Sequence, residues 1–367
     1  MRIDTFSKPV LLHLVGGNKT QGGMLSYARQ LVSCELPGFE QRIWKYRGYR
    51  PENDKFICLG WAKTVDVSLF TDLRSVALDF WPLYRWLRKN PATVLYAHNR
   101  PNAILAAVLR GICMAPVLAH VHTLGKRKHL YKRVWHMARA TVIYNSKLTC
   151  RYFGEPVDTA HIQEPPIQWP KRPISGEGRL VACGAIQEVK NFDLIIDAFN
   201  LAGEAAPRSL HIYGLSSEPF EPEYQQRIID RAKQNPRIHL HPWDERWTDQ
   251  LHYEDIFIHA RDKEPFGIVM LEAFAKGCRM VVPRPTFLDD LSHDGIFFAE
   301  LTPESLAERV AEAKCYTPSQ NLWEARRVFE NRYSIQSTIQ RVQAVLLSVT
   351  QDDWRFKGVN GASQISL

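Results

Sequence analysis

Short apolar runs alternate with amphipathic segments along most of this chain, and this alternation constrains the fold more than any other feature of the sequence. The runs VLLHLVG (10–16), TVLYAHN (93–99) and APVLAHVH (115–122) have the composition of buried strands, and MLSYARQLV (24–32) has the spacing of a helix. Strands that alternate with helices are typical of a parallel sheet with helices on both faces. The sequence therefore predicts an α/β protein.

A proline-rich stretch interrupts this alternation near the middle of the chain. Residues 163–178, QEPPIQWPKRPISGEG, contain four prolines and two glycines, which favour a linker. The pattern then restarts with LVACG (180–184) and SLHIYG (209–214). We expect two Rossmann-like domains, residues 1–165 and 166–334, that face a cleft. A helix at 335–350 is expected to return to the first domain, and residues 351–367 are expected to form a polar tail.

Composition excludes several classes of protein. No apolar run reaches the ~18 residues that a membrane-spanning helix needs, and the N-terminus lacks the small-residue cleavage site of a secretory signal. The seven cysteines have no short, metal-like spacing, which argues against a disulfide framework and a zinc site. These features favour a cytoplasmic location.

Positive charge is concentrated in one segment of a chain whose net charge is +8. Residues 80–154 contain no Asp or Glu, although they hold thirteen Lys and Arg residues. Such asymmetry indicates an anionic partner, and a solvated face without a partner is the alternative. Within the segment, residues 125–140 are predicted to form a basic amphipathic helix with Leu130, Val134, Met137 and Thr141 on its apolar stripe. The candidate acceptor or membrane face comprises Lys126, Arg127, Lys128, Lys132 and Arg133.

The segment EPFGIVMLE (264–272) places a carboxylate before a helix and another inside it. Pro265 and Gly267 exclude helix before about Ile268, so Glu264 is expected in a loop and Glu272 one turn into the helix. The N–H groups of Gly267, Ile268 and Val269 would then form an anion site suited to phosphate. The alternative is an acidic helix start that serves only as a cap.

Several segments together resemble a known family. They are EPFGIVMLEAFAKG (264–277), GAIQEVKNF (184–192), NRYSI (331–335), GGMLSYARQL (22–31) and HVHTLG (120–125). Across most of the chain they resemble the retaining glycosyltransferases of the GT-B fold, in the family-four group with a Glu-(seven residues)-Glu element. The resemblance implies a hexosyltransferase that uses a nucleoside-diphosphate sugar as donor substrate, with no metal or other cofactor and no nucleic acid partner.

The acid-free segment, together with the resemblance, predicts an acceptor and a location, because the N-terminal half of this fold generally holds the acceptor. The acceptor would be a glycan, or a lipid-linked or phosphorylated molecule, in the synthesis of cell-surface polysaccharide or glycolipid. The basic face would attach the protein reversibly to the inner face of the plasma membrane.

The resemblance also assigns roles to individual residues. Glu264 would contact the donor sugar, Lys190 would neutralise the leaving diphosphate, and His122 would lie beside the sugar, with His120 as the competing choice. Glu272 would hold the nucleotide ribose. The remaining candidates for donor binding are Phe266, Gly267, Ile268, Val269, Gly184 and the turn at Gly22 and Gly23.

One position departs from the family pattern. Ala185 stands where the family carries an arginine that helps to bind phosphate, and Arg261 and Lys263 are the candidate substitutes. This departure keeps open the alternative of a non-catalytic sugar-nucleotide-binding protein with the GT-B fold. An epimerase with that fold is a second, separate alternative.

Overall fold

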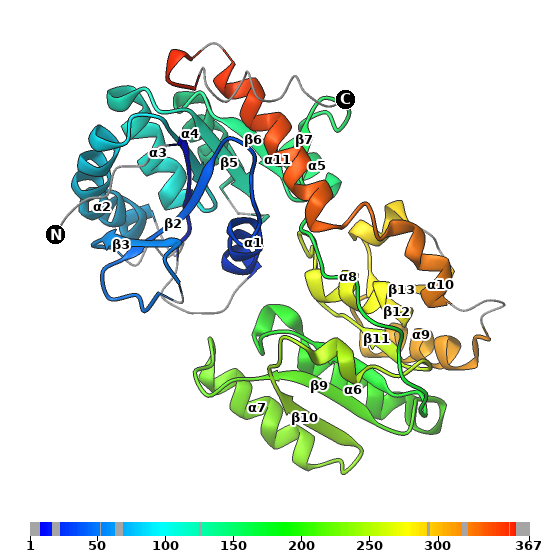
Figure 1. Ribbon diagram of the computed structural model, residues 1–367. Coiled ribbons are helices and arrows are strands. Elements are labelled where there is room, and N and C mark those ends of the chain that lie inside the picture. The colour runs from blue at the N-terminus through cyan, green and yellow to red at the C-terminus, as the bar shows by residue number, and fades with distance from the viewer. Residues whose placement is uncertain are drawn as a thin grey trace. The chain divides into compact units, whose positions relative to one another are not determined.

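The chain divides into two compact units, each built on one parallel sheet with helices on both faces (Figure 1). The computed structural model describes residues 8–16, 23–51, 53–62, 69–124, 127–291, 294–317, 322–351 and 353–356. Unit 1 comprises residues 1–166 and 335–367, and unit 2 comprises residues 167–334. Among the described residues, no helix is both long enough and apolar enough to cross a membrane.

Unit 1 contains a seven-stranded sheet in which all pairs are parallel, in the order β3-β2-β1-β4-β5-β6-β7. The strands are β1 (Val10–Leu14), β2 (Glu40–Tyr46), β3 (Phe56–Gly60), β4 (Thr93–Ala97), β5 (Val117–Val121), β6 (Thr141–Tyr144) and β7 (His161–Ile162). After β1 the chain adds β2 and β3 on one side of that strand, and it then continues with β4 on the other side, so the strand order switches between β1 and β4. In open α/β sheets, ligands bind at the carboxyl ends of the strands beside such a switch point.

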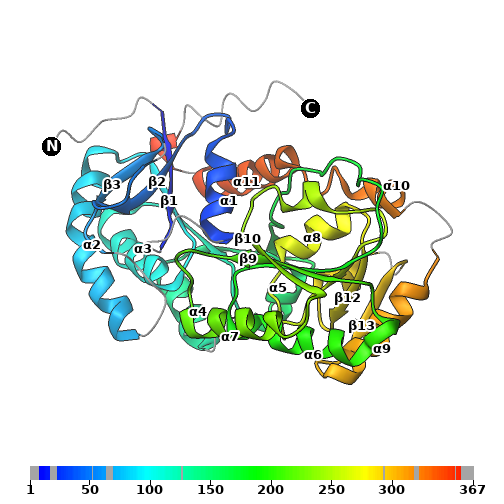
Figure 2. The same ribbon diagram turned by 90° about the horizontal axis from the view of Figure 1, so that it is seen from below.

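Helices cover both faces of this sheet (Figure 2). They are α1 (Gly23–Val32), α2 (Leu69–Lys89), α3 (Arg100–Cys113), α4 (Lys128–Met137), α5 (Lys147–Phe153) and α11 (Ile335–Thr350). Because side chains alternate along a strand, Leu12 packs in one core with Trp86 of α2, whereas Leu11 packs in another with Tyr27 of α1 and Val342 of α11. The helix expected at 335–350 therefore lies in the core of unit 1.

The apolar stripe predicted for the basic helix is confirmed at Val134, which is buried, and at Leu130, which packs against the same core, but it is wrong at Met137 and Thr141. Helix α4 ends at Met137, whose side chain is 68% exposed, and Thr141 already belongs to β6. The buried residues of the helix are Tyr131, Val134 and Trp135. The centroid of the Trp135 ring lies 5.1 Å from that of Phe153 in α5, and both rings belong to the same core. The face of α4 that carries Trp135 is therefore its inner face.

The prediction of a polar tail is also wrong for its first residues. Phe356 is fully buried in the core that contains Leu11 and Tyr27. The Arg355 guanidinium donates hydrogen bonds to the carbonyl oxygens of Cys113 and Met114. Burial of one aromatic ring therefore fixes this segment on unit 1, and residues 357–367 lie outside the described part of the chain.

Unit 2 repeats this strand order in a six-stranded sheet, β10-β9-β8-β11-β12-β13. The strands are β8 (Leu180–Cys183), β9 (Leu210–Leu215), β10 (Ile238–Pro242), β11 (Ile256–Ile258), β12 (Arg279–Pro283) and β13 (Ile296–Ala299). The switch point of this sheet lies between β8 and β11, so the carboxyl ends of these two strands are where a ligand is expected.

The helices of unit 2 also pack on both faces of their sheet (Figure 1). They are η1 (Glu188–Lys190), α6 (Phe192–Ala202), η2 (Gly203–Ala205), α7 (Pro222–Lys233), η3 (Trp247–Gln250), α8 (Ile268–Ala275), η4 (Phe287–Asp290), α9 (Pro303–Cys315), α10 (Leu322–Arg326) and η5 (Arg327–Phe329). Leu180 packs toward α6, α7 and α9, whereas its neighbour Val181 packs toward α8 and η3. The linker prediction holds for residues 163–178 in that they contain no helix or named strand.

Candidate active site

The carboxyl ends of β8 and β11 bring a lysine and a glutamate together in unit 2. Gly184 follows β8 with a φ of +144°, and a Cβ at that position would lie 3.9 Å from the Lys190 Nζ. The Lys190 side chain therefore lies over the end of β8. Asn191 Nδ2 donates a hydrogen bond of 2.7 Å to the carbonyl oxygen of Ala260, which ties η1 to the end of β11.

Glu264 lies among basic side chains at this switch point. The Lys190 Nζ donates to the Glu264 Oε2 at 2.9 Å, and one Arg261 guanidinium nitrogen lies 3.3 and 3.2 Å from the two carboxylate oxygens. The His259 Nε2 lies 3.3 Å from the Oε2. Burial alone would raise the pKa of Glu264, but Lys190, His259 and Arg261 together hold that pKa well below its usual range. Glu264 is thus an ionised, buried carboxylate.

Helix α8 begins at Ile268, directly after these residues, which confirms the prediction from Pro265 and Gly267. Gly267 has φ +79° and ψ 71°, and a Cβ there would lie 2.5 Å from the Met270 Cε and 3.0 Å from the Glu264 Cγ. Backbone conformation and space therefore both require glycine. The first amides of α8 have no partner within the helix and lie next to the Glu264 loop.

The other residues of this helix start differ in exposure. The Phe266 side chain is buried, and its ring stacks on that of Phe287 with centroids 4.6 Å apart. Ile268 and Val269 are half-buried. The backbone of this turn, rather than the Phe266 ring, is the part that can contact a ligand.

Glu272 is the second carboxylate of the segment, and it has a partner that the sequence did not indicate. The Trp247 Nε1 donates a hydrogen bond of 3.0 Å to the Glu272 Oε2. Burial raises the pKa of Glu272 from 4.5 to about 7, although the hydrogen bond from Trp247 acts in the opposite direction. Such perturbed carboxyl groups are concentrated at functional sites. Near neutral pH this carboxyl group is therefore close to half ionised.

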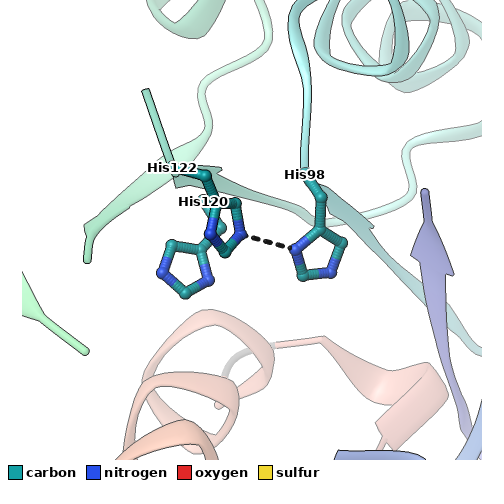
Figure 3. A group of neighbouring side chains, drawn as sticks. All are labelled: His98, His120 and His122. Carbon is teal, nitrogen blue, oxygen red and sulfur yellow. Dashed lines mark hydrogen bonds between the residues drawn. The ribbon is translucent and has the colours of Figure 1, made fainter. Parts of the chain in front are cut away.

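Unit 1 carries a row of histidines at its own switch point. His13, His98 and His120 are buried, and His122 is half-buried. The register of β1, β4 and β5 places all four on the sheet face that α1 and α11 cover. The His98 Nδ1 lies 3.0 Å from the His122 Nε2, and a dashed line in Figure 3 marks this contact. The row extends inward from His122, because the His13 Nδ1 lies 3.1 Å from the His98 Nε2.

The two histidines that the sequence left as competing choices have different surroundings. The His120 Nδ1 lies 2.9 Å from the Tyr96 hydroxyl oxygen, inside the core. His122 is the more exposed of the pair, and their rings are in contact with centroids 4.0 Å apart. His122 is therefore the better placed of the two to meet a ligand.

The same histidines are the candidates for a metal site in the described part of the chain. One nitrogen of each of His98, His120 and His122 lies within 4.8 Å of one nitrogen of the other two (Figure 3). Tetrahedral zinc at about 2.0–2.1 Å from each nitrogen would separate its ligand atoms by about 3.4 Å and needs a lone pair on each. The contact between His98 and His122 instead has hydrogen-bond geometry, which requires a proton between the two nitrogens. We therefore assign no metal to these residues.

The predicted basic face keeps only part of its charge unpaired. Arg127 and Arg133 are exposed, whereas Lys132 forms an ion pair of 2.6 Å with Glu155 and donates to the carbonyl oxygen of Phe153. The Lys128 Nζ lies 5.6 Å from the centroid of the Tyr152 ring. Lys126 and Gly22 lie outside the described residues, and Gly23 is the first residue of α1.

Two further features of unit 1 bear on that face. Arg100, another cation of the acid-free segment, is buried and pairs with Asp72. A pocket of about 720 Å³ lies beside the edge strand β7, and its lining includes Lys132, Trp135, Arg139 and His161. It lies along β6 and β7, away from the switch point of the sheet.

Comparison with known proteins agrees with this geometry. Residues 166–323 match the family model of glycosyl transferases group 1. Among solved structures, HepE from Anabaena in complex with UDP and glucose is 16% identical, with a TM-score of 0.71 over 92% of this chain and 99% of that one. Sucrose-phosphate synthase from Thermosynechococcus elongatus is 13% identical, with a TM-score of 0.75 over 94% of this chain and 100% of that one.

A third structure extends the comparison to lipopolysaccharide biosynthesis. WaaG, a glycosyltransferase involved in that process, is 13% identical, with a TM-score of 0.64 over 91% of this chain and 99% of that one. The curated proteins contain no significant match. At these identities the structural likeness shows the fold, and the family model covers unit 2 up to residue 323. The chain therefore has the two-domain GT-B fold, and residues 166–323 are similar to the glycosyl transferases group 1 family.

Proposed function

We propose that this protein is a retaining glycosyltransferase that moves a sugar from a nucleoside-diphosphate sugar to a glycan or to a lipid-linked or phosphorylated acceptor. The observation that carries the proposal is the group of Lys190, Arg261 and Glu264 at the switch point of unit 2, directly before helix α8. HepE, a protein of similar fold, binds UDP-glucose. A donor of this class offers a diphosphate, a ribose and a sugar, and unit 2 carries a candidate partner for each.

The diphosphate would bind to Lys190 and to the first amides of α8. Expulsion of a nucleoside diphosphate builds negative charge on the leaving group, and a fixed ammonium with a helix N-terminus stabilises that charge. In the structure, the Glu264 carboxylate accepts a hydrogen bond from Lys190. Because Glu264 is ionised, it can also accept hydrogen bonds from donor sugar hydroxyls, the role that the resemblance implies.

Arg261 supports activity despite the alanine at position 185. Its guanidinium lies 3.2 Å from the Glu264 Oε2, within the same group as Lys190. Lys263, the other candidate substitute, has a side chain that is 63% exposed and pairs with Asp262. We therefore propose that Arg261 supplies the second cation for the diphosphate, from the end of β11 instead of the end of β8.

Glu272 and His122 complete the proposed machinery. Glu272, in its ionised form, would accept hydrogen bonds from the ribose diol, and Trp247 would orient its carboxylate. The role of His122 beside the donor sugar rests on the resemblance of its strand end to the family. The acceptor and a reversible membrane attachment rest on the acid-free segment, whose exposed cations include Arg127 and Arg133.

The test is a donor screen with purified full-length protein. UDP-, GDP-, ADP- and dTDP-linked sugars are offered with glycan and lipid-phosphate acceptors, and nucleoside diphosphate release is measured. We expect release with at least one donor, and retention of the anomeric configuration in the product by NMR. Lys190→Ala should reduce turnover strongly, whereas Lys263→Ala, a change at an exposed lysine two residues from Arg261, should not.

Two results would contradict the proposal in different ways. Tight binding of a nucleotide sugar without release under any condition would favour the non-catalytic alternative. Conversion of the free nucleotide sugar into an isomer, without an acceptor, would favour the epimerase.

A further inference from the structure

The hydrogen bonds around Gln41 fix the protonation of the histidine row in unit 1. The Gln41 Nε2 donates to the carbonyl oxygens of Leu31 at 2.8 Å and Cys34 at 3.0 Å. Carbonyl oxygens only accept, so this atom is the amide NH₂ and the Gln41 Oε1 is the atom that faces His13. The orientation of the amide thus follows from its contacts.

His13 takes its tautomer from this oxygen. Its Nε2 lies 3.3 Å from the Gln41 Oε1 and must carry a hydrogen, because the oxygen can only accept. His13 is fully buried, and burial lowers its pKa to about 4, so the ring is neutral at physiological pH. A neutral imidazole has one N–H, which leaves a lone pair on the His13 Nδ1.

The same reasoning decides which ring nitrogen carries the hydrogen in His98 and in His122. The His98 Nε2 lies 3.1 Å from the His13 Nδ1 and therefore donates to it. Burial, with the neighbouring imidazoles, holds the pKa of His98 well below its usual range, so its Nδ1 keeps a lone pair. The His122 Nε2 lies 3.0 Å from that atom and must donate in turn. Burial lowers the pKa of His122 to about 3, so His122 is neutral as well.

The ring arrangement agrees with two hydrogen bonds in series. The centroids of His13 and His98 are 5.3 Å apart with an interplanar angle of 9°, and those of His98 and His122 are also 5.3 Å apart. The planes of His98 and His122 are tilted by 32°, and in both pairs a centroid separation of 5.3 Å fits rings whose facing nitrogens lie 3.1 and 3.0 Å apart. Exposure increases along the row, from the fully buried His13 to the half-buried His122.

We propose that Gln41, His13 and His98 act as positioning residues that lock His122 in its Nε2–H tautomer, so that its Nδ1 presents a lone pair to a ligand. Such an atom accepts a hydrogen bond from a sugar hydroxyl. A fully ionised phosphate has no hydrogen to donate, so the row selects a hydroxyl-bearing part of the substrate. This selectivity rests on the proposed function, whereas the tautomer itself does not.

The test is NMR of the full-length protein with ¹⁵N-labelled histidine, without any substrate, so its outcome does not depend on activity. The His122 signals are assigned from their loss in His122→Gln, and long-range ¹H–¹⁵N spectra then report which ring nitrogen carries hydrogen. We expect a protonated Nε2 and an unprotonated Nδ1 on His122. A hydrogen on the Nδ1 would overturn the proposal, whatever the donor screen finds.

Two variants cut the row at different links. Gln41→Leu removes the acceptor for His13, and His13→Phe removes the acceptor for His98. In either variant that folds, we expect His122 to populate its Nδ1–H form. The matched control is Tyr96→Phe, which removes a hydroxyl next to His120 and leaves the contacts from Gln41 through His13 and His98 to His122 in place. If His122 keeps its tautomer in a folded variant with the row cut, the three residues do not position it; if neither variant folds, the tautomer of the unmodified protein decides.

Discussion

Because the pKa of Glu272 is raised, removal of its charge should increase the stability of the protein and weaken its binding of nucleoside diphosphate. Burial moves that pKa from 4.5 to about 7. The folded state therefore disfavours the ionised carboxylate by roughly 3 kcal/mol relative to the unfolded chain. The sign follows from the direction of the shift: this cost is absent below pH 4.5, appears as the pH rises, and is complete above pH 7.

Glu272→Gln removes this charge and keeps an oxygen that can accept the hydrogen bond of Trp247. At pH 8 the variant should be more stable than the unmodified protein by roughly 3 kcal/mol, and at pH 5 by about 1 kcal/mol or less. The variant should also bind nucleoside diphosphate more weakly, by ~1–3 kcal/mol, because it loses charge-assisted hydrogen bonds to the ribose.

Thermal or urea denaturation at both pH values measures the first effect, and titration calorimetry with UDP and GDP measures the second. Glu245→Gln, at an exposed carboxylate of the same unit, is the control and should change neither quantity appreciably. Equal stabilisation by Glu272→Gln at pH 5 and pH 8 would refute the assignment of the burial cost. Unchanged affinity for every nucleoside diphosphate that the protein binds would refute the ribose role.

Three other perturbations test the remaining parts of the proposal. Arg261→Ala should lower turnover at least tenfold, measured as the rate of diphosphate release, if Arg261 is the second phosphate cation. Wild-type turnover in this variant would show that Arg261 does not replace the arginine that is missing at position 185. Turnover should persist in EDTA, and activity that disappears with chelator and returns with Mn²⁺ or Mg²⁺ would contradict the metal-independent mechanism. Arg127→Glu with Arg133→Glu should abolish co-sedimentation with anionic liposomes at low salt, since each basic residue near an anionic surface contributes about 1 kcal/mol; unchanged binding would leave this face without a role in attachment.

Local sequence was enough to predict the backbone of the candidate site in unit 2. Pro265 and Gly267 set the start of α8 at Ile268, because proline and glycine act on the residues next to them. The α/β class followed from the alternation of strands and helices, which the two parallel sheets confirm. In α4 the predicted stripe was right at Val134 but wrong at Met137, because the aromatic ring of Trp135 is buried on the inner face instead.

Side-chain partners could not be predicted in the same way. Trp247 is 25 positions from Glu272, Lys190 is 74 from Glu264, and His13 is 85 from His98. Lys190 and Glu264 meet because they follow the neighbouring strands β8 and β11, and His13 and His98 meet because β1 and β4 are neighbours. Trp247 of η3 meets Glu272 of α8 because both elements pack in the same core. The sequence by itself therefore determined the element types and the residues able to carry charge or accept protons. The tertiary structure decided which carboxylate is held ionised, which has a raised pKa, and which histidine nitrogens lie within hydrogen-bond distance of each other, because burial and long-range contacts set these properties.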